Sequence, residues 1–442
     1  MAIKYFVDKN LIPDDGSIKL LKMLDTNISS NDTKLYVYPD VHYKSGARVV
    51  NGLIIQSENN IYPACLGVEN CGFTFGLLGK DLEIERLNKV ACDLSKNNFF
   101  RNNYSEKNIE EMFSKKLKDD FSKKRELYEF LGYKDHRAVV RDSIRFLRKN
   151  GLIKMAAATL CHLGGGNHFL EIHKIAESEN DHLLGEYMII VHSDSISVGN
   201  YVNLVFSNLS ELDYLPFVFK VKAKTKYRIH QFLYYMRQHL LLKDFGNIVK
   251  LCFSQKDYRS IKCDSILGKN LLLAHNIASV FGEMNREELL RHFSEAYGGT
   301  VNLLGSHCHD NVTIETYSSQ KYVVHRNGVQ KVGDDELFIL PQAMGIGLIL
   351  MKNPQNEKAL FSANHGTGRF QDKPVAKEIY KEDDTENELA ENNVSLFRVG
   401  NGNLAEQNHA AFKKIDVIAS QMKKFNLGIP IARTIPVIVI KG

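Results

Sequence analysis

Apolar residues along this chain follow two periods, one typical of β-strands and the other typical of α-helices. Short runs rich in β-branched and aromatic residues predict strands over residues 34–38, 187–191 and 437–440. The first run is followed by Pro39 and Asp40, and the second is followed directly by His192 and Ser193. The pattern therefore predicts that polar loops begin where these two strands end.

Three other segments have the spacing or the capping residues of helices. Residues 136–150 place apolar side chains on one stripe, and Gly151 is suited to end that helix. Residues 411–425 repeat apolar residues at 4-3-4-3 spacing, which is typical of an amphipathic helix. A capping box at residues 285–288 predicts that another helix begins there and ends at Tyr297.

Charged residues are concentrated in three segments. Residues 101–126 are rich in Lys, Glu and Asp, which favours a solvated helical arm. Residues 220–228 form a basic run with one aromatic residue, which indicates an exposed strand or loop and offers a candidate phosphate contact. Residues 381–393 are mostly acidic or amide residues, and we expect an acidic surface loop there.

The 442 residues are 44% hydrophobic and 25% charged, a composition typical of folded globular proteins. Strands and helices are mixed along the chain without an internal repeat or a clear linker. We therefore predict one elaborated domain of the α/β (α+β) class with mixed sheets. A formal net charge of +5 permits a nucleic-acid partner without requiring one.

Three features bear on where the protein is found. The seven cysteines lack the spacing of a disulfide scaffold or a zinc ribbon, which favours a reducing compartment. The first eight residues include an aspartate and do not have the pattern of a signal peptide. No apolar run approaches the roughly 18 residues of a membrane span. Together these features predict a cytoplasmic protein without a membrane partner.

Six short segments carry histidine, cysteine or acidic residues beside glycines or at the ends of predicted strands. They are residues 39–42, 67–72, 164–171, 191–195, 306–311 and 364–369. Imidazole and thiolate suit Zn²⁺, Co²⁺ or Fe²⁺, and carboxylate or amide oxygens extend the range to Mn²⁺. Because the candidates are spread along the chain and not in close pairs, they predict a catalytic metal site assembled by the fold. Single histidines such as His42, His162 or His275 also fit a hydrogen-bonded structural role.

His365 is open to two interpretations. Glycines follow it, which leaves room beside the ring, and Arg369 lies four residues later. A neutral imidazole can attack phosphorus as a nucleophile, and the guanidinium fork of an arginine can pair with phosphate oxygens. The residues themselves are equally compatible with His365 being one more metal ligand.

Together these motifs resemble the RtcB family of GTP-dependent RNA ligases. The matching segments occur in the family order, at residues 39–42, 164–171, 192–193, 308–309, 341–345, 365–369 and 441–442. The resemblance runs from about residue 35 to residue 442. It implies mixed sheets around a central cleft that holds two metal ions, usually Mn²⁺, and the nucleotide. Residues 205–265 match the family least and form a candidate insertion.

The resemblance also implies a role for individual residues. It implies His365 as the nucleophile that becomes guanylylated, and Asp40 as an acidic residue that supports the metal centre. The implied metal ligands are Glu69, Cys71, His168, His192 and His309. The implied GTP-binding residues are Asn167, Phe169, Glu171, Met344, Gly366, Gly368, Arg369, Phe412 and Lys441.

The implied reaction joins an RNA 2′,3′-cyclic phosphate or 3′-phosphate end to a 5′-hydroxyl end, with GTP and Mn²⁺, in RNA repair or tRNA processing. The implied partners are such RNA ends, GTP and an activating protein. Two alternatives stay open: an enzyme that caps a 3′-phosphate without sealing or opens a cyclic phosphate, and a homologue that binds RNA ends without turnover.

Several departures from the family pattern lie close to the chemistry. Val68 stands where the family has a metal-binding aspartate, so Glu69 is the candidate substitute. Asp194 and Ile196 stand where the family has glycine and arginine, and the lost arginine removes a phosphate contact. Phe412 replaces a tyrosine, which keeps stacking on a base but loses the hydroxyl.

Overall fold

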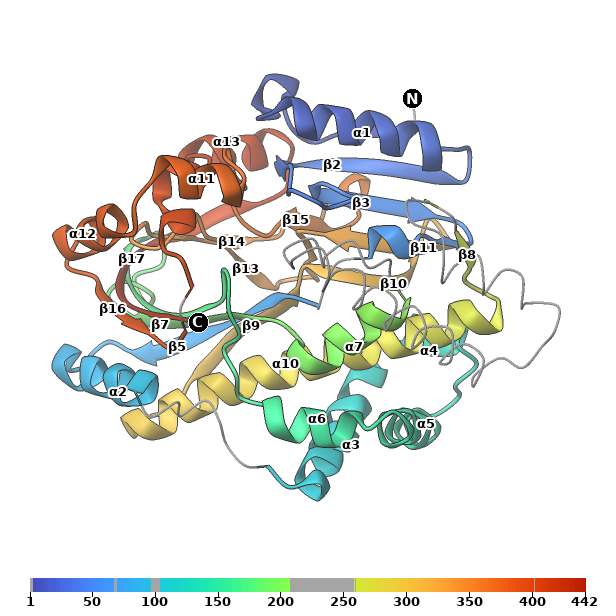
Figure 1. The fold of residues 1–442 in the computed structure, drawn as a ribbon, viewed down its shortest axis with the longest axis horizontal. Coiled ribbons are helices and arrows are strands. Elements are labelled where there is room, and N and C mark those ends of the chain that lie inside the picture. Colours follow the sequence, from blue (N-terminus) through green and yellow to red (C-terminus); the bar gives the residue numbers. More distant parts are fainter. Residues whose placement is uncertain (1–2, 67–69, 97–103, 207–257, 259, 401) are drawn as a thin grey trace, which may run out of the picture.

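The computed structural model describes residues 3–66, 70–96, 104–206, 258, 260–400 and 402–442. Within this part, two large β-sheets lie beside a layer of helices (Figure 1). One sheet has the strand order β1-β2-β3-β11-β10. The other has the order β13-β14-β17-β6-β7-β5-β9, with β16 paired to β17. This mixture of helices and mixed sheets confirms the predicted α+β class.

The strands have the following bounds. The five-stranded sheet contains β1 (Ile3–Tyr5), β2 (Thr33–His42), β3 (Asn51–Ser57), β10 (Asp310–Tyr317) and β11 (Gln320–Asn327). The eight-stranded sheet contains β5 (Gly72–Gly79), β6 (Phe169–Ser178), β7 (Tyr187–Ser193), β9 (Asn302–Cys308), β13 (Leu337–Leu340), β14 (Ile349–Lys352), β16 (Ser395–Arg398) and β17 (Ile429–Lys441). Two small ladders pair β4 (Asn60–Ile61) with β8 (Ile261–Lys262) and β12 (Val329–Lys331) with β15 (Ser362–Asn364).

The helices lie along one side of the sheets and around their edges (Figure 1). They are α1 (Asp15–Ile28), α2 (Ile84–Lys96), α3 (Glu106–Lys123), α4 (Arg125–Phe130), α5 (His136–Lys149), α6 (Leu152–Thr159), α7 (Ile196–Phe206), α10 (Ile266–Tyr297), α11 (Lys373–Ile379), α12 (Glu382–Glu391) and α13 (Ile415–Lys424). Short 3-10 turns cover Lys9–Leu11, Pro63–Cys65, Glu357–Ala359, Ala405–Gln407 and His409–Ala411. None of the helices in the described ranges is long and apolar enough to cross a membrane.

Helix α10 is continuous, so the predicted helix start at residue 285 is wrong. The helix begins after Ser265, whose hydroxyl caps the N–H of Gly268 at 3.0 Å. The side chain of Asn285 accepts from the N–H of His162 at 3.2 Å and donates to its carbonyl at 2.8 Å. It also donates to the hydroxyl of Ser193 at 3.1 Å. The polar residue that suggested a cap therefore ties the middle of α10 to the end of β7.

Most other predicted elements are confirmed. The three predicted strands lie inside the longer strands β2, β7 and β17. The helix predicted over residues 136–150 is α5, and Gly151 follows it with a φ of 70°. Only the later part of the stripe at residues 411–425 is α-helical, as α13, because the chain first makes the 3-10 turn His409–Ala411.

The charged segment at residues 101–126 is only partly a solvated arm. Most of it forms α3, which buries Ile109, Phe113 and Leu117 in a hydrophobic core shared with α10 and α5. The prediction of a solvated arm is wrong for this face of the helix. Periodic apolar residues were outnumbered by charges, yet their spacing was enough to bury one side of the helix.

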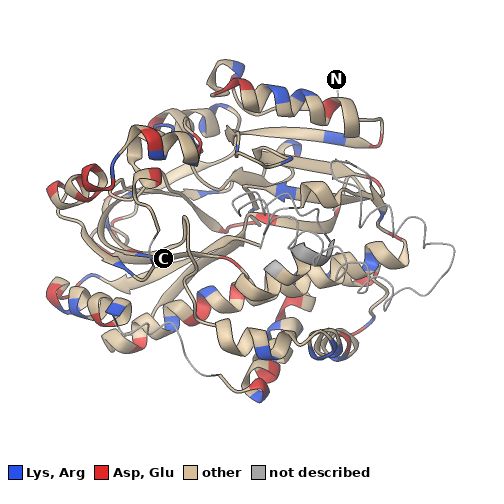
Figure 2. Ribbon diagram, in the orientation of Figure 1, with Lys and Arg blue, Asp and Glu red and all other residues tan. Residues whose placement is uncertain are grey.

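The acidic segment at residues 381–393 is mostly α12, so the prediction of a loop there is wrong. Thr385 and Leu389 are buried on one face. Most of the other residues of α12 are acidic, and the helix is seen at the left edge of Figure 2. The acidic residues in the first turn stabilise the helix, because their negative charges lie at the positive end of the helix dipole. The basic run at residues 220–228, and residues 207–257 of the candidate insertion, lie outside the described residues.

Strand pairing brings the ends of five strands to one edge of the larger sheet. Gly72, the first residue of β5, lies opposite Ser193 of β7 and Cys308 of β9. Phe169, the first residue of β6, lies opposite Lys441 at the end of β17. Because each neighbouring pair is antiparallel, one strand begins where the next one ends. The loops at this edge therefore carry residues from distant parts of the sequence into one place.

Replacing Asn285 by Ala is expected to destabilise the protein by about 2 kcal/mol, because two backbone groups of His162 and the Ser193 hydroxyl lose a partner. Urea unfolding followed by circular dichroism measures this free energy. Glu295→Ala on the exposed side of the same helix is the control and is expected to change stability by less than about 0.5 kcal/mol. Equal stability of the two variants would contradict the role given to Asn285.

Candidate active site

One thiol and three imidazoles meet at the edge where the five strand ends converge. Cys71 precedes β5, His168 precedes β6, His192 is near the end of β7, and His309 joins β9 to β10. The Cys71 Sγ lies 3.0 Å from His192 Nε2 and 3.4 Å from His168 Nε2. His192 Nε2 lies 3.5 Å from His309 Nε2. All four side chains are buried.

These distances fit a shared metal ion. With metal–ligand bonds of about 2.0–2.3 Å, two ligands on one ion are separated by about 3.0–3.7 Å. The ligand atoms of Cys71, His192 and His309 all lie within 4.8 Å of one another. The residues that the sequence predicted as metal ligands are thus brought together, with the exception of Glu69, which lies outside the described residues.

Burial keeps the three imidazoles in the form that binds metals. It lowers the pKa of His168 to about 4, and it lowers the pKa values of His192 and His309 well below their ordinary value. A neutral imidazole has one lone pair to donate. In His192 the Nδ1 donates to the carbonyl of Asn167 at 3.2 Å, which leaves Nε2 to face Cys71.

The glycine-rich bend before His168 is shaped by close contacts. Gly164 has a φ of 81°, and a Cβ at this position would lie 2.5 Å from His168 Nδ1. Lys441 donates to the carbonyls of Gly166 and His168, so it fixes the bend from the end of β17. Burial, together with the smaller effect of the nearby Lys373, lowers the pKa of Lys441 to about 7. This lysine, predicted to contact the nucleotide, therefore also holds the loop that carries the predicted metal ligand His168.

His365 stands beside this cluster and not within it. Its ring centroid lies 4.5 Å from that of His309. Its Nδ1 donates to Asp40 Oδ2 at 2.8 Å and to the carbonyl of Gly328 at 2.7 Å. Nε2 is therefore the ring nitrogen left for a reaction partner. Burial lowers the pKa of His365, but the hydrogen bond and charge of Asp40 outweigh it and hold the pKa above its ordinary value.

Asp40 is fixed by the backbone around it. Its side chain is fully buried at the end of β2. Gly368 packs on it with a φ of 75°, and a Cβ there would lie 2.2 Å from the carbonyl oxygen of Asp40. Asp40 was predicted to support the metal centre. In the structure its side chain accepts a hydrogen bond from His365.

Two aromatic residues flank this region from different elements. Phe169 is half-buried, and its ring centroid lies 5.4 Å from that of His192. The guanidinium of Arg369 lies 4.2 Å from the ring centroid of Phe412, which is a cation–π distance. Arg369 also donates to the backbone carbonyl of Glu406 at 2.6 Å, and burial lowers its pKa to about 10. Phe412 is therefore held on one face by a buried cation.

Glu171 has a partner that the sequence analysis did not identify. Its carboxylate accepts a hydrogen bond from His173 Nε2 at 3.0 Å, and the other ring nitrogen of His173 lies 2.9 Å from the Thr434 hydroxyl. Residues two apart on a strand share a face, so the spacing of Glu171 and His173 on β6 was the available signal. The histidine fixes the orientation of one carboxylate oxygen.

Three other residues that were predicted to contact the nucleotide lie in three different environments. Met344 is buried among apolar side chains that include Leu389 and Val439. Gly366 follows His365, and its carbonyl accepts from the side chain of Asn364 at 2.7 Å. The side chain of Asn167 is exposed beside the metal cluster.

The sequence analysis did not assign two buried residues with ionisable side chains, Arg286 and Asp194, to the site. Arg286 on α10 is almost fully buried and donates to Thr74 and to the carbonyl of Ser193, both at 3.1 Å. It therefore joins β5 to β7 directly behind the ligand cluster. Its signal in the sequence was a charged residue within a helix that is otherwise largely apolar on that side. Asp194, noted only as a departure from the family pattern, lies 3.9 Å from His168.

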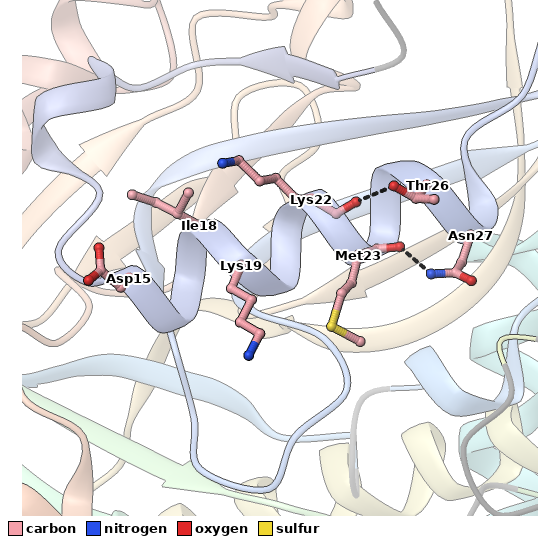
Figure 3. Close-up of a pocket in the computed structure, with 7 residues that line it drawn as sticks. All are labelled: Asp15, Ile18, Lys19, Lys22, Met23, Thr26 and Asn27. Atoms are coloured by element: carbon pink, nitrogen blue, oxygen red, sulfur yellow. Dashed lines mark hydrogen bonds between the residues drawn. The ribbon is translucent and has the colours of Figure 1, made fainter.

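A shallow depression on the outer side of α1 is separate from this chemistry (Figure 3). It is lined by Asp15, Ile18, Lys19, Lys22, Met23, Thr26 and Asn27. All of these residues belong to one helix, at the top of Figure 1, and none of them is a predicted ligand. The depression therefore does not enlarge the site.

Comparison with known proteins gives the same family along most of the chain. The family model described as tRNA-splicing ligase RtcB matches residues 26–442. A tRNA-splicing ligase RtcB of Aeropyrum pernix is 23% identical over 324 residues, which cover 65% of this chain and 60% of that protein. The tRNA-splicing ligase RtcB of Methanocaldococcus jannaschii is 22% identical, over 88% of this chain and 41% of that protein.

A bacterial relative shows a shorter match. The RNA-splicing ligase RtcB of Mycobacterium tuberculosis is 25% identical over 196 residues, 40% of this chain and 45% of that protein. The matched regions thus span less than two thirds of the length of these relatives. Because the family model covers nearly all of the sequence, this chain belongs to the RtcB family as a divergent member.

Proposed function

We propose that this protein is an RNA ligase that joins 2′,3′-cyclic phosphate or 3′-phosphate ends to 5′-hydroxyl ends, using GTP and Mn²⁺. The observation that carries the proposal is the position of His365. It lies 4.5 Å from the metal-facing His309 between ring centroids, and Asp40 holds its Nδ1. A cytoplasmic location and an activating protein partner stay predictions of the sequence.

His365 would act as the nucleophile through Nε2. Asp40 accepts the Nδ1–H, so it fixes the reactive tautomer and stabilises the positive charge that develops on the ring. A bond forms between Nε2 and the α-phosphorus of GTP while pyrophosphate leaves. The guanylate then passes from the histidine to the RNA 3′-phosphate. The 5′-hydroxyl displaces GMP in the last step, which forms the phosphodiester.

The buried thiol and imidazoles supply the metal-binding side of this centre. Cys71, His168, His192 and His309 would hold the ions. Bound metal ions offset the charge of phosphate oxygens and lower the pKa of a hydroxyl or water bound to them. The neutral state of the three imidazoles supports this assignment, because a protonated ring has no lone pair to donate.

The nucleotide side would be formed by residues of β6 and by the chain near Phe412. Glu171 can accept from the N–H groups of guanine, and His173 orients it for that task. The ring of Phe412, backed by Arg369, offers a face on which a base can stack. Ile196 cannot replace the family arginine as a phosphate contact, so capping without sealing is the second candidate activity.

Substituting His365 by Ala is expected to abolish covalent labelling of the protein by α-labelled GTP with Mn²⁺, because no other imidazole combines a free Nε2 with the Asp40 contact in the described ranges. It should also abolish ligation of 3′-phosphate to 5′-hydroxyl RNA. The exposed His182→Ala variant serves as the control and should keep both activities. Labelling that persists in His365→Ala would refute the mechanism, and labelling without ligation in the unmodified protein would favour capping.

Asp40→Asn is expected to slow covalent labelling about 100-fold at saturating GTP, since the amide keeps the shape but removes the charge that stabilises the histidine ring. The KM for GTP should stay within about twofold of the unmodified protein, because the carboxylate contacts His365 and not the nucleotide. Initial labelling rates at several GTP concentrations separate the two parameters. A large rise in KM at an unchanged maximal rate would contradict this role.

Glu171→Gln is expected to lower the preference for GTP over ATP in labelling by about 100-fold, because the neutral amide is a weaker partner for guanine N–H groups. Competition between the two labelled nucleotides measures the ratio directly. Glu177→Gln, on the same strand with an exposed side chain, is the matched control. An unaltered nucleotide preference in Glu171→Gln would remove this residue from the base site.

A further inference from the structure

A carboxylate that the family pattern does not contain lies beside the ligand cluster. Asp194 directly follows β7, and its Oδ2 is 3.9 Å from His168 Nε2. The side chain of Asp194 is only 8% exposed, and that of His168 only 9%. The same His168 Nε2 lies 3.4 Å from the Cys71 thiol on its other side. His168 therefore stands between a thiol and a carboxylate, both of which can bind a cation.

The turn after β7 fixes the direction of this carboxylate. The other oxygen of Asp194, Oδ1, accepts from the N–H of Ile196 at 2.7 Å. Ile196 has a φ of 39°, a left-handed conformation that is rare for a β-branched residue. Because Oδ1 holds this turn, Oδ2 is left to face His168. One oxygen thus organises the loop and the other is directed at the cluster.

The buried carboxylate of Asp194 has no lysine or arginine within ion-pair distance in the part of the chain that the structure describes. Within the described part of the chain, His168 alone provides a basic nitrogen within 4.0 Å of its carboxylate. A buried carboxylate without a compensating charge is costly. A bound divalent cation would supply that charge.

The donor chemistry points the same way. Without a carboxylate, the described ligands offer only sulfur and nitrogen, a set that Zn²⁺ prefers, whereas Mn²⁺ favours oxygen donors. Val68 cannot provide the oxygen that the family takes from that position. The gap of 3.9 Å between Asp194 and His168 slightly exceeds the separation of about 3.0–3.7 Å expected for two ligands on one ion. The carboxylate would have to move toward the cluster to bind the ion, because the donor atoms of Cys71, His168 and Asp194 do not all lie within 4.8 Å of one another.

We propose that Asp194 binds the second metal ion together with Cys71 and His168, while Cys71, His192 and His309 bind the first. Asp194 thereby replaces, from the loop after β7, the carboxylate that the chain lacks at Val68. This assignment rests on the proposed function for the identity of Mn²⁺, and it gives Cys71 the position of a ligand shared by both ions. It assigns the oxygen donor to Asp194 instead of Glu69.

Direct Mn²⁺ binding tests this assignment without any turnover. Free Mn²⁺ is measured by electron paramagnetic resonance during titration of the full chain, and isothermal calorimetry gives the affinities. The unmodified protein is expected to bind two ions. Asp194→Asn should keep the first ion and weaken the second by at least about 10-fold. Its Oδ1 still accepts from Ile196, so circular dichroism and the thermal midpoint should match the unmodified protein.

Two further variants make the result specific. Glu69→Gln removes the rival carboxylate and should retain two ions, and the exposed Asp181→Asn is the matched control for a lost surface charge. The proposal is overturned if Asp194→Asn binds both ions with unchanged affinity, or if only Glu69→Gln loses the second ion. Covalent labelling by GTP is scored separately. A protein that loses its second ion in Asp194→Asn but never labels would keep this metal site and refute the ligase function.

Discussion

Antiparallel pairing around β5 is the constraint on which the candidate site depends. Gly72 lies opposite residues at the ends of both neighbouring strands, Ser193 and Cys308, so the three strands share one edge. A slip of one residue in this register would turn every side chain of β5 to the other face of the sheet. The thiol of Cys71 would then move away from the imidazoles. The buried Arg286, which donates to both β5 and β7, stabilises the register at the point where the chemistry needs it.

Burial has opposite consequences for the two kinds of histidine at this edge. For the rings of the proposed metal ligands, such as His192, it lowers the pKa and so favours the neutral form, which has a lone pair for an ion. For His365, the contact with Asp40 outweighs burial and raises the pKa, so Asp40 would stabilise the positive charge that develops on the ring when a neutral Nε2 attacks. The two environments lie side by side, since the rings of His309 and His365 are 4.5 Å apart between centroids. One hydrogen-bonded carboxylate therefore distinguishes the proposed nucleophile from the proposed metal ligands among similar side chains.

The sequence predicted local elements and motif residues better than it predicted partners. The strands at β2 and β7 and the helix α5 followed from periodicity, because alternation and the 3.6-residue repeat are local properties. The false helix start at Asn285 shows the limit of this approach. A polar residue that satisfies the backbone of a distant loop has the same local pattern as a cap. The link between Glu171 and His173 was readable from strand alternation, whereas the contact between Asp40 and His365 joins residues 325 apart in sequence and depends on the fold.

The difference between local patterns and contacts made by the fold also explains why a position-by-position comparison did not identify Asp194 as a candidate ligand. Along the sequence, Val68 is a lost ligand and Asp194 is an unrelated change in another motif. In space, Asp194 and Cys71 border the same edge, because Asp194 follows β7 and Cys71 precedes β5, its antiparallel neighbour. A metal ion requires an oxygen donor at a suitable distance, and this donor can come from any loop that borders the site. A substitution that weakens one motif can therefore be balanced by a carboxylate from the next strand, provided that its backbone holds the side chain toward the ligands. The hydrogen bond from Ile196 to Asp194 meets that condition.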